Sequence, residues 1–115
     1  MQFMALIYSS EKAGDDVDFP TLMEQYRKFG EDAKTAGVLY NDGNALQPVS
    51  TATSVQVRDG KSIVTDGPFA ETKEQLGGYY ILDCKDLDEA LKWAAKIPSA
   101  RYGTVEVRPV MTFDD

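Results

Sequence analysis

The residues in this sequence best suited to chemistry follow one another over a short stretch: Asp66, Glu71, Lys73 and Tyr79. A carboxylate whose pKa rises in a half-buried apolar pocket can act as a general base, and a nearby lysine can pair with it or stabilise an enolate. Asp66 ends a strand-like run directly before Gly67-Pro68, so its side chain would lie on a rigid element beside a loop able to close over it. We therefore take Asp66 as the candidate catalytic residue, and the candidate ligand-binding residues are Glu71, Lys73, Tyr79, Arg58 and Arg108, with the arginines as holders of an anion.

The segment from Asp66 to Gln75 is longer than a tight hairpin requires, and loops of this kind usually carry function or form a lid. A purely structural interpretation is equally open, in which Asp66 caps a turn through its own side chain, Pro68 fixes φ and Phe69 fills the edge of the core. The two interpretations differ in one testable respect. A functional site requires the candidate side chains to converge on one pocket, whereas a structural loop lets them point separately into solvent.

The absence of histidine removes many mechanisms, since the chain contains none and has only one cysteine, Cys84. Without histidine there is no Ser-His or Cys-His nucleophile system, no imidazole base and no His-based metal site. Acid-base work must therefore fall to carboxylates, Lys, Tyr or Cys, and we expect no cofactor and no transition metal. We expect Cys84 to be a small core residue, because nothing cationic beyond Lys85 lies near it in the sequence.

Length and charge restrict the partners. A chain of 115 residues with 43% apolar composition fits a single domain over residues 1–115. The net charge of −7, with Lys and Arg spread along the chain, disfavours nucleic acid and anionic membranes. No apolar stretch approaches the roughly 20 residues of a membrane span, and Met1 to Ile7 lacks the basic flank of a signal peptide. A lone cysteine fits a reducing compartment, so we expect a cytoplasmic location.

Apolar periodicity and turn residues predict an ordered set of elements. They are a strand over 2–8, a loop over 9–18, a helix from Asp18 or Thr21 to Gly37, a turn-rich insert over 41–44, a hairpin of 53–58 and 61–65 around Asp59-Gly60, a strand over 79–84, a helix from Asp86 to Pro98, and a strand over 104–110. On the first helix, Met23 and Tyr26 fall on the apolar stripe and are expected in the core.

This order of elements predicts an α+β fold in which two helices cover one face of an antiparallel sheet. The strands over 2–8 and 79–84 are nevertheless apolar on both faces. The second face therefore needs a partner, and an identical chain is the simplest one, so we expect a homodimer. A cavity between the two sheets would then be the default site for a small-molecule ligand.

Asp66-Gly67-Pro68-Phe69, continued through Glu71-Thr72-Lys73-Glu74 and Gly77-Gly78-Tyr79-Tyr80, resembles the signature of the YCII-related family, in the branch named after its Asp-Gly-Pro-Phe (DGPF) motif. Ala45-Leu46-Gln47-Pro48, Leu87-Asp88-Glu89-Ala90 and Val105-Glu106-Val107-Arg108-Pro109 extend the resemblance over nearly the whole chain. The resemblance implies a ferredoxin-like α+β fold that pairs into a dimeric barrel. Because members of this branch are often encoded beside or fused to extracytoplasmic-function sigma factors, it also implies such a factor as a partner.

The resemblance leaves the reaction open, and functions of different classes compete. Some relatives in the wider family are similar to small lyases or dehydrochlorinases whose proposed pair is a His on the first helix with an Asp. This chain departs from that pattern, since its first helix offers Glu24, Tyr26 and Arg27 instead. A lyase-like enzyme that uses carboxylate and lysine chemistry is one hypothesis. A non-catalytic module that binds a small molecule or a protein is the main one, and a dimer without a ligand is the third.

Overall fold

The computed structural model describes residues 1–12 and 18–113, and the predicted loop over 9–18 lies partly outside these residues. The fold consists of a four-stranded sheet, a separate two-stranded hairpin, two α-helices and two short 3-10 helices. In chain order the elements are β1 (Gln2–Ser9), α1 (Phe19–Thr35), β2 (Leu39–Ala45), η1 (Val49–Thr51), β3 (Thr53–Arg58), β4 (Lys61–Asp66), β5 (Gln75–Asp83), α2 (Leu87–Ala94), η2 (Pro98–Arg101) and β6 (Thr104–Pro109).

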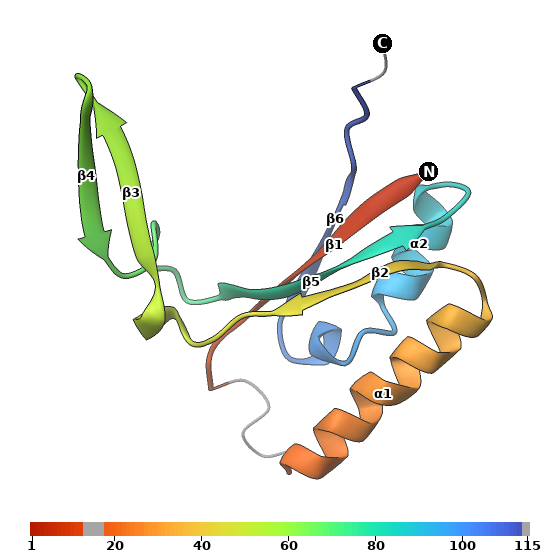
Figure 1. Ribbon diagram of the computed structural model, residues 1–115. Helices are drawn as coiled ribbons and strands as arrows, with labels where there is room; N and C mark the ends of the chain where they lie inside the picture. Colours follow the sequence, from red (N-terminus) through yellow and green to blue (C-terminus); the bar gives the residue numbers. More distant parts are fainter. Residues whose placement is uncertain (13–17, 114–115) are drawn as a thin grey trace.

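The main sheet has the strand order β2-β5-β1-β6, and every neighbouring pair is antiparallel. Both helices lie on one face of this sheet (Figure 1). In chain order the main-sheet strands and the helices are β1, α1, β2, β5, α2 and β6, and β1 and β5 lie side by side at the centre of the sheet. This is the ferredoxin-like topology. The predicted α+β class and the position of the helices are confirmed. No helix within the described residues is long and apolar enough to cross a bilayer.

The core lies between the helices and one face of the sheet. Alternate residues of β1 are buried there, as expected for a strand with a period of two. Phe29 of α1 is 4% exposed, and its ring centroid lies 5.1 Å from that of Tyr80 and 6.5 Å from that of Trp93. Cys84 is buried in the same core, as predicted, and burial is the main reason that the pKa of its thiol is raised. The most deeply buried large side chains are Phe3, Leu82 and Ile97.

The outer face of the sheet, which lies opposite the helices, is also apolar. Met4 of β1 pairs with Ile81 of β5, and Leu6 pairs with Tyr79. Together with Tyr8, these side chains are only partly buried. Nothing among the described residues of the same chain forms a second layer over them (Figure 1). The predicted two-sided apolar pattern is therefore present in the structure.

Both helices begin at acidic caps, as the sequence predicts. The Thr21 backbone N–H donates to the Asp18 carboxylate at 3.1 Å and the Thr21 hydroxyl donates to it at 2.7 Å, which lowers the pKa of Asp18. Asp86 accepts from the Glu89 backbone N–H at 2.9 Å. The predicted end of the second helix at Pro98 is wrong, because α2 ends at Ala94 and Pro98 begins η2.

The segment predicted as a turn-rich insert over 41–44 is instead part of β2, which pairs with β5 through two irregularities. Gly43 makes this possible. Its φ is 64°, and a Cβ there would lie 1.6 Å from the Tyr79 carbonyl oxygen. Only glycine combines that backbone angle with so close an approach to the neighbouring strand. The polar residues over 41–44, which suggest a turn in the sequence, therefore form part of a distorted edge strand.

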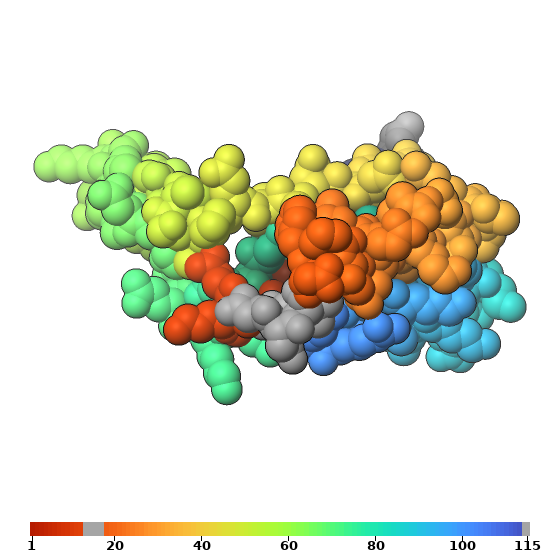
Figure 2. Space-filling model, turned by 90° about the horizontal axis from the view of Figure 1, so that it is seen from below, coloured from red at the N-terminus to blue at the C-terminus, as the bar shows by residue number. Residues whose placement is uncertain are grey.

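The hairpin of β3 and β4 is confirmed, and both turn residues have positive φ, 52° at Asp59 and 74° at Gly60. This is the geometry that suits a two-residue hairpin turn. The hairpin forms a sheet of its own and stands away from the main sheet, on the side opposite the helices (Figure 1). Figure 2 shows it from the helix side as a separate projection beyond the body of the molecule.

Candidate functional site

The loop that opens at Asp66 borders a cavity of about 450 Å³. Glu71 and Lys73 both line this cavity, so the structure brings together two of the predicted ligand-binding residues. Glu11 lines it as well, and its carboxylate accepts a hydrogen bond from the Val49 backbone N–H at 2.8 Å. Asp66 is exposed and is not among the lining residues. The remaining lining residues are Ser50, Gly67, Pro68, Thr72 and Gln75.

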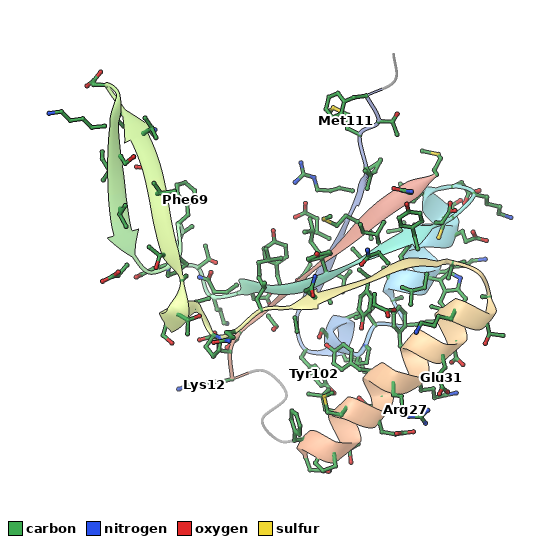
Figure 3. The ribbon with its side chains drawn as sticks, in the orientation of Figure 1. Lys12, Arg27, Glu31, Phe69, Tyr102 and Met111 are labelled. Carbon is green, nitrogen blue, oxygen red and sulfur yellow. The ribbon has the colours of Figure 1, made fainter. Side chains whose placement is uncertain are left out.

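The turn after Asp66 is held by Gly67. The Gly67 backbone N–H donates to the Ala52 carbonyl at 2.8 Å, and its own carbonyl accepts from the Ser54 hydroxyl at 2.8 Å. Within the described residues, the Asp66 side chain makes no hydrogen bond of its own. Phe69 is 83% exposed beside the hairpin (Figure 3), so it does not fill the edge of the core. The structure thus ties the motif to the base of the hairpin.

The other predicted ligand-binding residues lie in three further places. Arg58 is exposed beside the hairpin turn, where its guanidinium donates to the Val57 carbonyl at 3.0 Å. Arg108 is on β6, with its Nε 3.6 Å from a carboxylate oxygen of Glu106. Tyr79 lines a second cavity, and its hydroxyl accepts from the Asn44 amide at 3.0 Å. The predicted residues therefore do not converge on one pocket.

The second cavity has a volume of about 430 Å³, within the range of small-molecule sites, and lies between α1, β2, β5 and η2. We call it the tyrosine pocket. Tyr26 comes from α1, Tyr80 comes from β5, and Tyr102, labelled in Figure 3, follows η2. Tyr79 of β5 also lines the cavity, but it pairs with Leu6, so its side chain is directed to the outer face of the sheet. The other lining residues are Ile7, Ser9, Leu22, Met23, Asp42, Gly43, Asn44, Ala45, Gly77, Gly78 and Ser99.

The polar groups of the tyrosine pocket are ordered. The Tyr26 hydroxyl is hydrogen-bonded to the hydroxyl of Ser99, which is buried. Burial, followed by the charges of Tyr26 and Asp42, raises the pKa of Tyr80 to about 12. The Tyr80 phenol therefore stays protonated at neutral pH, where it can donate a hydrogen bond but cannot act as a base.

The charge of the tyrosine pocket is one-sided. Among the lining residues that the structure describes, Asp42 is the only one with a carboxyl side chain, and none is a lysine or an arginine. A carboxylate oxygen of Asp42 lies 3.6 Å from Lys34 Nζ, with both side chains more than half exposed. An exposed pair at that distance is weak, which leaves the carboxylate available to a ligand. Within the described ranges, no cluster of three or more Cys, Asp or Glu side chains is placed to hold a metal ion.

Sequence reasoning missed this pocket because its residues are distant along the chain. Tyr26 packs against the core as predicted, but it also lines the pocket, and Met23 is half exposed. Asp42 falls in the segment over 41–44 that the sequence predicts as a turn-rich insert, so its place beside the pocket is not evident from the sequence. The available signal is the number of tyrosines, six in the chain, of which four contribute to the lining of this cavity.

The fold and its pocket define a ferredoxin-like α+β domain with a helix-side cavity, and comparison with known proteins assigns the family. The family model of the YCII-related domain matches residues 1–114. The chain is also 37% identical over 122 residues to an uncharacterised protein of Rhizobium meliloti (strain 1021), covering 98% of this chain and 94% of that protein. This protein belongs to the YCII-related domain family.

Proposed function

We propose that this protein binds a small organic molecule in the tyrosine pocket and acts as a homodimer. The observation that carries the proposal is the composition of that cavity: among the residues that the structure describes, its lining includes Tyr26, Tyr80 and Tyr102, apolar side chains, one aspartate and no lysine or arginine. Aromatic walls provide contact area for a ring or an alkyl group. The protonated Tyr80 hydroxyl provides a donor for one polar acceptor on the ligand.

The charge of the pocket restricts the class of ligand. An anionic ligand would enter beside Asp42, and no described lining residue is a lysine or an arginine that could neutralise it. A neutral molecule avoids this cost, and a cation gains attraction from both the carboxylate and the tyrosine ring faces. The ligand class we propose is therefore a neutral or cationic small molecule, with an amine as the favoured cation.

The homodimer is supported by the outer face of the sheet. Met4, Leu6 and Ile81 are apolar and only partly buried, and they lie on one face of the sheet, where Met4 pairs with Ile81 and Leu6 pairs with Tyr79. Large apolar patches of this kind usually mark protein contacts. A stable pair would bury well over about 1,000 Å² in total. A protein partner such as an extracytoplasmic-function sigma factor stays a proposal that rests on the family resemblance.

A lyase-like activity is the second candidate function, with one observation in its favour. Glu71 and Lys73 line the cavity beside the motif loop together with Glu11. A carboxylate and an ammonium group in one cavity are suited to proton abstraction and enolate stabilisation. Such an enzyme would work without histidine, and Asp66 would have to reach that cavity through movement of the loop.

Ligand binding in the tyrosine pocket can be tested with a substitution that places a bulky side chain in the cavity. Ala45 pairs with Gly78, as does Ile7, so the Ala45 side chain lies on the helix side of the sheet and its residue lines the pocket. In a thermal-shift screen of small amines and neutral aromatics, Ala45→Phe should abolish the stabilisation that hits give to the wild type. Ala36→Phe, at the exposed C-cap of α1, is the matched control and should keep it. Hits that stabilise both variants equally would contradict the proposed site.

A further inference from the structure

The hairpin of β3 and β4, which we call the arm (residues 53–66), has one apolar face. Val55 pairs with Val64, and Val57 pairs with Ser62, so these three valines lie on the same face. Their exposures are 65%, 66% and 60% for Val55, Val64 and Val57. The opposite face carries Gln56, Arg58, Lys61, Ile63 and Thr65. This alternation is typical of a strand pair with one buried face, yet no described part of the same chain covers the valine face.

The arm does not gain stability from its own fold. A two-stranded hairpin alone is at best marginally stable in water, and sheets need a packed face to persist. The arm forms no sheet with the other strands, and all but one of its paired residues are exposed. Leaving three valines in water forgoes the free energy that burial of their side chains supplies. A surface from another molecule would supply this free energy.

The shape of the chain favours a second copy of the same chain as the molecule that covers the valine face of the arm. The arm stands on the side of the sheet opposite the helices, at one end of the apolar outer face (Figure 1). Two sheets packed face to face lie about 10 Å apart, whereas a six-residue strand spans about 20 Å. A second copy seated on the outer face would therefore lie alongside the arm for its whole length. The contact of the valines would continue the contact of the sheets.

Charge complementarity points to the same occupant. The tip of the arm carries Arg58 and Lys61 on either side of Asp59, while the chain as a whole has a net charge of −7. A basic tip projecting toward an acidic body offsets part of the repulsion between two copies. Phe69, which follows the arm at its base, is a further large apolar side chain left exposed, and Ile63 on the opposite face of the arm is 46% exposed.

We propose that the arm is a dimerisation arm, whose valine face packs against the body of a second copy. The proposal rests on the homodimer proposed above and adds the surface that holds it together. It also gives the DGPF motif a role. Gly67, directly after β4, is hydrogen-bonded to Ala52 and Ser54 on the β3 side, so the motif closes the base of the arm.

Photocrosslinking tests the arm directly. Benzoylphenylalanine in place of Val57 should give a crosslinked dimer on irradiation, with the adduct mapping to a peptide outside the arm. The same group in place of Gln56, one residue away on the opposite face, should give little or none. In sedimentation, the combined Val55→Thr, Val57→Thr and Val64→Thr chain should dimerise at least about 100-fold more weakly than the wild type. Gln56→Thr should not change dimerisation.

The possible results distinguish the proposal of the dimerisation arm from the proposal of the homodimer. A wild-type monomer at micromolar concentration would overturn both proposals. A wild-type dimer that neither crosslinks from position 57 nor weakens with the threonine changes would overturn the arm alone, and would leave the sheet-to-sheet dimer standing. Equal crosslinking from positions 56 and 57 would also overturn it, because the proposal requires one face of the arm to be covered.

Discussion

Replacing Phe29 with alanine should lower the free energy of unfolding by about 3–5 kcal/mol. Phe29 joins α1 to both other parts of the core, since its ring meets Tyr80 of β5 and Trp93 of α2. Truncation removes the buried ring and leaves a cavity that rigid aromatic neighbours cannot close. Such a loss is a large share of the stability of a small domain. Urea denaturation at equal chain concentration measures it.

The matched control is Phe19→Ala, the same substitution in the same helix at a residue that is 71% exposed. We expect it to change stability by no more than about 1 kcal/mol. Similar losses for the two variants would mean that the helix is not packed as described.

Leu6→Asp should raise the dimer dissociation constant at least about 1,000-fold, because an unpaired carboxylate would be buried at the centre of the contact. Leu6 lies on the outer face of the central strand β1, between Tyr79 of β5 and Glu106 of β6. The chain itself should stay folded, since this side chain is on the face away from the helices. Analytical ultracentrifugation gives the constant, and circular dichroism checks the fold.

Leu6→Ala serves as the graded comparison, because it removes the same apolar side chain without adding a charge. We expect a smaller loss of dimerisation than with Leu6→Asp. If Leu6→Asp leaves the dimer dissociation constant unchanged, the outer face of the sheet is not the dimer interface.

Local chemistry made some elements predictable. The turn Asp59-Gly60 requires two residues that accept positive φ, and the sequence supplies them between two alternating strands. Asp86 and Glu89 have the spacing of a capping box, which predicts the start of α2 from the sequence alone. The end of α2 was harder to place, because Ile97 is buried as if the helical stripe continued, although the helix has already ended at Ala94.

Long-range geometry was not available from the sequence. The turn residues around Gly43 look like a loop until β5 is placed beside them, because the strand depends on a close approach to Tyr79. The detachment of the arm is likewise invisible, since its alternation suits a sheet of any size. The candidate sites show the same difference between residues that are close in sequence and residues brought together by the fold. Glu71 and Lys73 are near in sequence and share a cavity, whereas Tyr26, Asp42 and Tyr102 meet only through the fold.

If the tyrosine pocket selects its ligand by charge, as proposed above, a pair of probes of similar size and opposite charge tests this selectivity most directly. Phenethylamine and phenylacetate carry the same ring and opposite charges, so titrating each into the wild type by NMR isolates the sign preference. We predict that phenethylamine shifts resonances of the pocket tyrosines and that phenylacetate does not. Asp42→Asn should weaken the amine by about 5- to 30-fold, the loss of one partly exposed charge contact. Tighter binding of phenylacetate, or an amine affinity unchanged by Asp42→Asn, would contradict the account.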